Sequence, residues 1–403
     1  MNVKFYSSLA AGTVEAPPSK SMAHRLLTCA CLANGRSVIK NISYSNDILA
    51  TLDCLETLGA KCERGDDYVI VDGIDVHSFM PSGALKCRES GSTLRFMIPI
   101  ALLCGERCEF NGTQYLMHRP QSVYEELFVR QGIKFKRGDD YILAKGSLKP
   151  GNIKIVGNVS SQFVSGLLFA LPNLDSDSVL EIIPPVESRS YIDLTLKSLE
   201  KFGVKAEWTD ENTLFIKGNQ QFVPCDITVE GDYSNACAFD AFNTVGGHVI
   251  VTGLDENSLQ GDRVYKEYFK ALTEGKAELD ISDCPDLGPV LFAVAAANHG
   301  GVFTGTDRLR IKESDRISSM KTELEKVGAY VYEEDSKVTV ISAPLSEPAG
   351  EIDSHNDHRI VMAMSLILSK TGGVITNAQS INKSLPDYFD KLKTLSVKFE
   401  TEQ

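Results

Sequence analysis

The stretch Pro17–Arg25, PPSKSMAHR, decides how the chain is interpreted, because an apolar run from Leu26 to Ala33 follows it directly. Either serine of the stretch can cap a helix start, and Gly35 suits the position just past a helix end. Lys20 and Arg25 therefore lie near the N-terminus of a predicted apolar helix, where unpaired N–H groups already carry a partial positive charge. An anion bound in front of the helix explains two cations there. For this stretch alone, two solvated surface charges explain them equally well.

The same arrangement occurs five more times, so we predict six buried helices. Each is a run of apolar residues with a polar or charged entrance. A helix that is apolar all round belongs in the core of a large protein, and each run is too short to span a membrane. The further entrances are Glu89–Arg95, Ser160–Gln162, Asp232–Asn235, Pro285–Asp286 and Asn356–Arg359.

A second repeat alternates with the first. Its copies share the end of an amphipathic helix, a glycine stop and a strand–turn–strand hairpin, at Leu58–Ile70, Gln131–Leu143, Phe202–Leu214 and Val327–Val338. The fourth repeat in chain order, around Gly275, has no hairpin before Pro285. The spacing of roughly 70 residues in the first half indicates an internal repeat. We therefore expect an α/β fold of two lobes with three α/β units each, residues 14–226 forming the first lobe and residues 1–13 with 227–403 the second, whose first unit is shortened.

Composition restricts the kind of ligand. The chain has 403 residues, of which 43% are hydrophobic and 24% are charged, as is usual for a soluble globular protein. Its net charge of −13 argues against a nucleic-acid partner. Ten cysteines without metal-like spacing, and no apparent signal peptide or membrane span, predict a reduced cytoplasmic protein. Against this acidic background, cations at helix entrances favour a small anionic ligand.

Three further motifs carry cations. Arg119 follows a glycine-containing loop at Gly112–His118, and the stretch Arg308–Arg316 packs four cations and two acids around a predicted helix start. Taken alone, Arg308–Arg316 is typical of a solvated charged turn, and Lys383 is typical of a surface lysine.

Together these motifs resemble the 5-enolpyruvylshikimate-3-phosphate synthase family of enolpyruvyl transferases. They appear in the family's order from end to end, and the ordered set is far more specific than any one member. The set comprises Pro18–Ser21 with Arg25, Ser90–Ser92 with Arg95, Arg119-Pro120, Ser160–Gln162, Ser188 with Tyr191–Asp193, Glu230–Asp232, Asn257-Ser258 with Gln260–Asp262, Pro285-Asp286, Ile311–Arg316, Asn356–Arg359, and Lys383 with Pro386–Tyr388.

The resemblance implies a transferase that joins phosphoenolpyruvate to the 5-hydroxyl of shikimate 3-phosphate, with release of phosphate. This reaction lies on the shikimate route to aromatic amino acids. In this family glyphosate competes with phosphoenolpyruvate for binding to the enzyme. The implied fold has two lobes, each of three α/β units with buried parallel helices and mixed sheets. No metal or organic cofactor is implied. We expect a cytoplasmic monomer that acts on these small molecules, without a nucleic-acid or membrane partner.

Residue roles follow from the same resemblance. Shikimate 3-phosphate would be held by Lys20, Ser21, Arg25, Ser160, Ser161, Gln162, Ser188, Tyr191, Asp286 and Lys312. Phosphoenolpyruvate would be held by Lys20, Gly91, Arg119, Gln162, Arg316, Arg359 and Lys383. In catalysis, Asp286 with Lys312 beside it would accept the 5-hydroxyl proton. Glu313 and Lys20 would serve protonation and deprotonation at the methylene carbon.

Two departures and two alternatives accompany this assignment. Glu89 and Arg308 stand where the best-known members carry asparagine. The sister enzyme that acts on UDP-N-acetylglucosamine uses a loop cysteine before its own Arg-Pro, whereas the loop Gly112–His118 has none. A non-catalytic organic-anion-binding protein would need the cations, but not Asp286 and Glu313 together at helix starts.

Overall fold

The computed structural model describes residues 1–402, and the chain divides into two compact lobes. The first lobe is Lys20–Glu230, and the second combines Met1–Ser19 with Gly231–Gln403. The sequence placed the two crossings between lobes after residues 13 and 226. The structure has them at Ser19–Lys20 and Glu230–Gly231.

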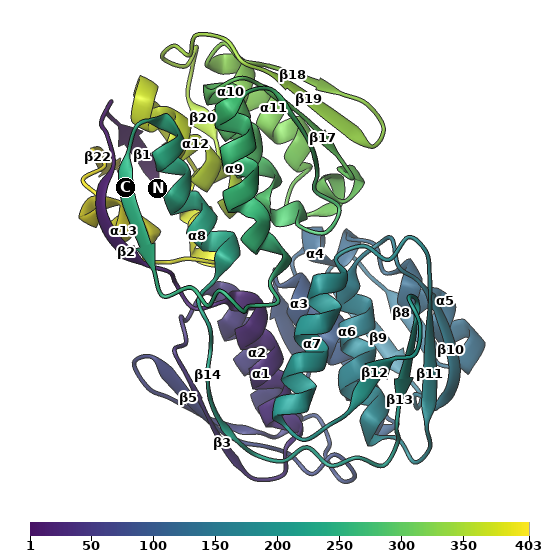
Figure 1. Ribbon diagram of the computed structural model, residues 1–403. Helices are drawn as coiled ribbons and strands as arrows, with labels where there is room; N and C mark the ends of the chain where they lie inside the picture. The colour runs from purple at the N-terminus through teal and green to yellow at the C-terminus, as the bar shows by residue number, and fades with distance from the viewer. Residues whose placement is uncertain (403) are drawn as a thin grey trace. The chain divides into compact units, whose positions relative to one another are not determined.

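The first lobe contains three four-stranded sheets of one topology (Figure 1). In each sheet two parallel strands are followed by an antiparallel hairpin. The strand orders are β14 (Asp226–Thr228), β3 (Arg36–Lys40), β5 (Tyr68–Asp72), β4 (Lys61–Arg64); β6 (Leu85–Arg88), β7 (Arg107–Gly112), β9 (Tyr141–Lys145), β8 (Lys134–Arg137); and β10 (Gly151–Val156), β11 (Ser178–Ile183), β13 (Thr213–Ile216), β12 (Ala206–Trp208).

The hairpin turns follow from local sequence. The motif Arg-Gly-Asp-Asp-Tyr occurs twice, and in both copies the glycine N–H donates to the tyrosine carbonyl at 2.8 Å, from Gly65 to Tyr68 and from Gly138 to Tyr141. An added Cβ at either glycine would lie within 2.4 Å of that tyrosine ring. The close approach of ring to backbone therefore requires glycine.

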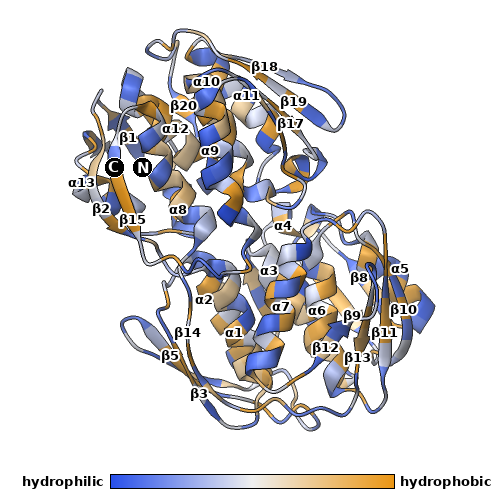
Figure 2. Ribbon diagram, in the orientation of Figure 1, coloured by the Kyte–Doolittle hydropathy of each residue, from blue (hydrophilic) through white to orange (hydrophobic). Residues whose placement is uncertain are grey.

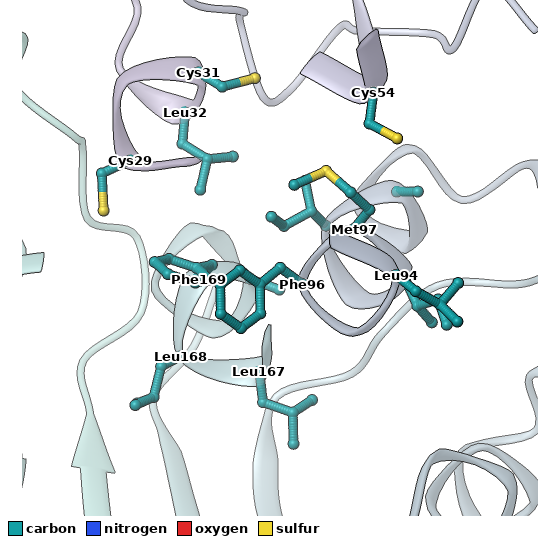
Figure 3. Close-up of a cluster of buried hydrophobic side chains, with 14 of the residues drawn as sticks. Cys29, Cys31, Leu32, Cys54, Leu94, Phe96, Met97, Leu167, Leu168 and Phe169 are labelled. Atoms are coloured by element: carbon teal, nitrogen blue, oxygen red, sulfur yellow. The ribbon is translucent and has the colours of Figure 1, made fainter. Parts of the chain in front are cut away.

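Three apolar helices, α1 (Lys20–Leu32), α3 (Gly91–Ala101) and α6 (Ser161–Ala170), form the core of this lobe. Figure 3 shows their side chains in one cluster, in which the rings of Phe96 and Phe169 lie edge to face with centroids 5.1 Å apart. Figure 2 shows hydrophobic residues along the helices of this lobe. The outer helices are α2 (Asn46–Leu58), α5 (Ser122–Gln131) and α7 (Arg189–Lys201), with the short segments α4 (Gln114–His118), η1 (Leu102–Cys104) and η2 (Leu171–Asn173).

The second lobe repeats the pattern with two modifications. Its strand orders are β15 (His248–Thr252), β2 (Ala11–Glu15); β16 (Ala277–Asp280), β17 (Gly301–Thr304), β19 (Lys337–Ile341), β18 (Tyr330–Glu333); and β20 (Ile352–Asp353), β21 (Gly373–Thr376), β1 (Asn2–Phe5), β22 (Phe399–Glu402). The fourth repeat has no hairpin, as predicted, so its sheet has two strands. In the last sheet β1, from the start of the chain, occupies the place of a hairpin strand.

The helices of the second lobe follow the same division. The buried helices are α8 (Tyr233–Asp240), α10 (Gly288–Ala297) and α12 (His358–Thr371), and the outer helices are α9 (Tyr265–Glu274), α11 (Arg316–Lys326) and α13 (Tyr388–Thr394). Five short 3₁₀ segments join them: η3 (Ala241–Val245), η4 (Gly261–Val264), η5 (Pro285–Leu287), η6 (Asp307–Ile311) and η7 (Ala378–Lys383). All six predicted buried helices are therefore present, and the α/β fold of repeated units is confirmed.

Candidate active site

A chain of buried hydrogen bonds joins the entrances of three helices in the first lobe. The Nδ1 atom of His24 in α1 lies 2.7 Å from Oγ1 of Thr51 in α2. That oxygen lies 2.7 Å from Oγ1 of Thr93 in α3, which donates at 2.8 Å to Oγ of Ser90, the N-cap of α3. All four side chains are buried. The chain therefore holds the starts of α1, α2 and α3 together at one end of the helix layer.

Lys20, the first residue of α1, is held by a carboxylate that no sequence motif indicated. Its Nζ atom lies 2.8 Å from Oδ2 of Asp47, and the two side chains are 17% and 13% exposed. Asp47 lies in the first turn of α2, behind the N-cap Ser45. An acid is common there because it complements the helix dipole, so the local sequence gave no sign of this second role.

Arg25 ties α1 to α7 through neutral oxygens. Its buried guanidinium donates from Nε to Oγ1 of Thr195 at 2.8 Å and from Nη2 to the Tyr191 carbonyl at 2.8 Å. Its Nη1 donates to the Ser21 carbonyl at 2.7 Å. None of these three partners is a carboxylate, so they leave the positive charge of Arg25 uncompensated beside the helix entrances.

Arg95 and Gln162 connect α3 to α6 in the same way. Nη1 of Arg95 donates to Oε1 of Gln162 at 2.6 Å, and Nε2 of Gln162 donates to Oγ of Ser92 at 2.8 Å. The guanidinium also lies over the ring of Phe163, 4.7 Å from its centroid. Gln162, predicted to contact both substrates, thus has both ends of its amide engaged within the lobe.

The predicted serines stand at helix starts. Ser160 is the N-cap of α6, and its Oγ accepts the Gln162 N–H at 3.3 Å. Ser161 is the first residue of that helix and is buried. Ser188 precedes α7 with φ of 52°, in the left-handed region. Such ends, with their N–H groups, are suited to a phosphate.

Gly91 and Arg119 are in direct proximity in this lobe. Gly91 opens α3, and a Cβ atom added to it would lie 2.7 Å from Nη1 of Arg119. The Arg119 side chain is largely buried, and its carbonyl accepts a hydrogen bond from Arg137 Nη2 at 3.2 Å. The structure thus brings these two residues together at the entrance of α3.

In the second lobe, Arg316 gathers three carboxylates. It is the first residue of α11, and its side chain is 1% exposed. Its Nη1 lies 2.8 Å from Oδ1 of Asp286, its Nη2 2.7 Å from Oε2 of Glu313, and its Nε 2.8 Å from Oδ2 of Asp357. The two predicted acid–base residues, Asp286 and Glu313, therefore share one guanidinium. Asp357 is fully buried and also caps α12, a role that its place in the Asn356–Arg359 motif could have indicated.

Lys312 completes this cluster, with its Nζ 3.1 Å from Oδ1 of Asp286. Burial alone would raise the pKa of Asp286, but the charges of Lys312, Arg316 and Arg359 outweigh burial and hold that pKa well below its usual range. Burial lowers the pKa of Lys312, and the charge of Asp286 opposes that shift. Asp286 is thus ionised, and its basicity is low while these three cations act on it.

Two local interpretations of the sequence are wrong. Lys383 is not a surface lysine: it is 8% exposed, and its Nζ donates to the Asn356 carbonyl at 2.6 Å. Arg308 is not solvated, because it is 5% exposed and its Nη2 donates to the Ser282 carbonyl at 2.7 Å. Short stretches of charged sequence suggest solvent exposure, but here the packing of η6 and η7 buries the charges.

Arg359 lies at the entrance of α12 and connects it to α8. Its Nη1 donates to the Ser234 carbonyl at 2.7 Å, and its Nη2 donates to Ser234 Oγ at 2.5 Å. The side chain is 3% exposed. Helix entrances in this lobe thus carry buried cations, as those of the first lobe do.

Solved structures with the same fold include an EPSP synthase and an enolpyruvyl transferase. EPSP synthase from Acinetobacter baumannii superposes with a TM-score of 0.82 at 21% identity, and all of both chains is covered. The enolpyruvyl transferase NikO from Streptomyces tendae superposes with a TM-score of 0.75 at 14% identity, with 99% of this chain and 98% of that chain covered. These superpositions place the chain in this fold class.

Within that class the chain belongs to the EPSP synthase family, described as 3-phosphoshikimate 1-carboxyvinyltransferase, whose model matches residues 7–392. A relative from Clostridium beijerinckii with that name is 38% identical, over 99% of this chain and 98% of the relative. A relative from Clostridium kluyveri with the same name is 39% identical, over 95% of each chain. Among residues 1–402, no helix combines the length and apolarity needed to cross a membrane.

Proposed function

We propose that this protein transfers the enolpyruvyl group of phosphoenolpyruvate to the 5-hydroxyl of shikimate 3-phosphate and releases phosphate. The observation that carries the proposal is the cluster in which Asp286 and Glu313 both bind Arg316, with Lys312 on Asp286. Two carboxylates held on one cation suit a reaction that needs an acid–base group at oxygen and another at carbon. Family membership and the names of the relatives agree with this reaction.

The proposed substrate contacts are those that the family resemblance implies. Shikimate 3-phosphate would bind the first-lobe residues Lys20, Ser21, Arg25, Ser160, Ser161, Gln162, Ser188 and Tyr191, and the second-lobe residues Asp286 and Lys312. Phosphoenolpyruvate would bind Lys20, Gly91, Arg119 and Gln162 of the first lobe, and Arg316, Arg359 and Lys383 of the second. Arginine forks match the paired oxygens of carboxylate and phosphate, and helix starts add N–H donors.

The proposed chemistry balances in two stages. Glu313, with Lys20, delivers a proton to the methylene carbon of phosphoenolpyruvate, which leaves C2 electron-poor. The 5-hydroxyl oxygen attacks C2 while Asp286 takes its proton, forming a tetrahedral adduct. The adduct then loses phosphate, and Glu313 takes back a proton from the methyl group, which regenerates the double bond. Cations around the phosphate stabilise the charge that develops on it.

Asp286 has a low basicity in the free protein, whereas the proposed mechanism uses it as a base. The two fit together if bound substrates neutralise the cations around it. Lys312, Arg316 and Arg359 are the cations that hold its pKa down. Anionic substrates that bind the same cations would neutralise part of their charge and raise the basicity of Asp286. The base would then become effective when the substrates are bound.

Release of phosphate from phosphoenolpyruvate tests the proposal, with shikimate 3-phosphate or UDP-N-acetylglucosamine supplied in separate reactions. We expect release with shikimate 3-phosphate only. Release with UDP-N-acetylglucosamine alone would instead identify the sister transferase. Binding of phosphoenolpyruvate without release in either reaction would identify an organic-anion-binding protein.

We further propose that the protein works as a monomer in the cytoplasm. Each lobe has its own hydrophobic core, and the proposed site residues all come from one chain. Sedimentation at the concentration used for the assay tests the monomer. A dimer that dissociates with loss of turnover would contradict it.

A further inference from the structure

The segments that lead to Asp286 and to Lys312 lie against each other in the second lobe. One leaves β16 and reaches η5 through Ile281–Cys284, and the other leaves β17 and reaches η6 through Gly305. Gly305 has φ of 68°, and an added Cβ there would lie 2.8 Å from the Ser282 nitrogen. The two backbones are therefore in close contact just before they reach the catalytic pair.

Arg308 is the residue of η6 whose side chain binds the segment Ile281–Cys284. Its Nη2 donates to the Ser282 carbonyl at 2.7 Å, and the residue is 5% exposed. On the Asp286 side, the Ile281 N–H donates to the Thr304 carbonyl at 3.0 Å, and the Ser282 N–H donates to Oδ1 of Asp280 at 2.9 Å. Among these three hydrogen bonds, only the one from Arg308 connects the segment to η6. Arg308 precedes Lys312 by four residues.

We propose that Arg308 is a positioning residue for the Asp286–Lys312 pair. Its hydrogen bond to Ser282 holds the segment before Asp286 against η6, and its buried positive charge acts on the ammonium of Lys312. This inference rests on the proposed function, in which that pair serves the 5-hydroxyl. It differs from a substrate-binding role, because the hydrogen bond that carries it runs from Nη2 of Arg308 to a backbone carbonyl of its own lobe.

The charge has a measurable consequence. The charged groups around Lys312 are Asp286 on η5, Arg308 on η6, the adjacent Glu313, and Arg316 on α11. Burial lowers the pKa of Lys312 most, Arg316 and Arg308 lower it further, and the two carboxylates oppose them. Loss of Arg308 should therefore raise the pKa of Lys312. If turnover needs the ammonium form, the alkaline limb of the pH–rate profile should move to higher pH.

Two substitutions separate the charge from the hydrogen bond. Arg308→Lys keeps the charge, but the lysine ammonium ends one bond short of the position of Nη2. Arg308→Gln loses the charge and is shorter still. Arg310→Gln is the matched control, because Arg310 lies on the same 3₁₀ helix and pairs instead with Asp315 at 3.4 Å and Glu333 at 3.0 Å.

We expect both Arg308 variants to lose roughly 10- to 100-fold in kcat, because small misplacement of reacting groups is costly. The backbone amides of Ser282, Asp283, Cys284 and Asp286 should also exchange hydrogen faster in both variants. Only Arg308→Gln should move the alkaline limb upward, by about half a pH unit or more. Arg310→Gln should leave the limb in place.

Normal kcat and unchanged amide exchange in Arg308→Lys would overturn the positioning role. An alkaline limb in Arg308→Gln that coincides with that of Arg308→Lys would overturn the electrostatic role. If Arg308→Gln does not fold, Arg308→Lys still tests the hydrogen bond. Turnover of shikimate 3-phosphate by the unsubstituted protein tests the proposed function separately, so failure of one is distinguishable from failure of the other.

Discussion

Gly91 and Arg119 are packed so closely that a methyl group on the glycine would lie 2.7 Å from Nη1 of the arginine. Non-bonded carbon and nitrogen atoms do not approach to that distance, so one of the two residues must shift. Gly91 begins α3 directly after its N-cap, and hydrogen bonds hold that start in place. The end of a long side chain yields more easily than a capped helix start. Glycine at position 91 therefore sets where the Arg119 guanidinium can lie.

Gly91→Ala should weaken the binding of phosphoenolpyruvate and of glyphosate, because the added methyl group displaces Arg119. The binding of shikimate 3-phosphate should not change. We expect the KM for phosphoenolpyruvate and the Ki for glyphosate to rise roughly 10-fold or more, the effect of losing about 1.4 kcal/mol or more from a charge-assisted bond. Gly83→Ala is the control, since an added Cβ there meets nothing within 4 Å. Equal losses for both substrates would contradict this placement of Arg119.

Asp286→Asn should lower kcat roughly 10²–10⁴-fold, the usual contribution of a general base. The amide keeps the shape of the carboxylate but cannot take the hydroxyl proton. Equilibrium binding of shikimate 3-phosphate should change far less. Asp283→Asn, an exposed change in the same segment, is the control. Near-normal turnover in Asp286→Asn would remove Asp286 from the mechanism.

Arg316→Met should destabilise the protein by about 3 kcal/mol or more, because it leaves a buried carboxylate without its main cation. Asp357 is fully buried beside Nε of Arg316. Urea unfolding at neutral pH measures the loss. Arg310→Met, which removes a more exposed arginine, should cost about 1 kcal/mol or less. Similar losses in the two variants would show that the three carboxylates do not depend on Arg316.

His24 should make the protein less stable as the pH falls. Burial, with the nearby charges of Lys20 and Arg25, lowers the pKa of His24 well below its usual range. Below about pH 6.5 the unfolded chain therefore binds a proton that the folded chain does not, and the free energy of unfolding decreases. In His24→Asn, the decrease between pH 7.5 and 5.5 should be smaller by about 1 kcal/mol. Parallel pH profiles for variant and parent would refute this.

His355 should make the protein more stable at low pH than at high pH, the opposite of the effect of His24. Its Nε2 lies 2.8 Å from Oε1 of Glu323, and that hydrogen bond raises the pKa of His355. The stabilisation is fully present below the unfolded pKa, about 6.5, and is lost as the pH rises through the raised folded value. The parent should therefore exceed His355→Gln in unfolding free energy by more at pH 5.5 than at pH 8.5. A difference that grows toward high pH would reverse the assignment.

The repeated signals of the fold could be predicted from the sequence because they arise within a few residues. The apolar helix after Ser160, the glycine stop at Gly132 and the two Arg-Gly-Asp-Asp-Tyr turns each depend on local capping or backbone conformation. The missing hairpin before Pro285 could also be predicted locally, because the sequence there has only one strand-like segment. Six copies of one pattern then predict a fold of repeated α/β units.

The candidate site was predicted mostly residue by residue. The family resemblance placed Lys312 beside Asp286, as the structure has it, but the motifs indicated Lys20 and Arg316 without showing which carboxylates they bind. Nothing local relates Lys20 to Asp47, which lies in a different helix. Pairing of this kind depends on which helix entrances pack side by side.

By itself the sequence determined the succession of helices and hairpins and the kinds of residue at their entrances. Only the tertiary structure decided that Arg316 binds three carboxylates, that Arg308 and Lys383 are buried, and that β1 completes the last sheet beside β21 and β22. The physical reason is the distance along the chain over which each interaction acts. Capping, turns and helical periodicity act over a few residues, whereas burial and ion pairing depend on which distant segments the packed core brings together.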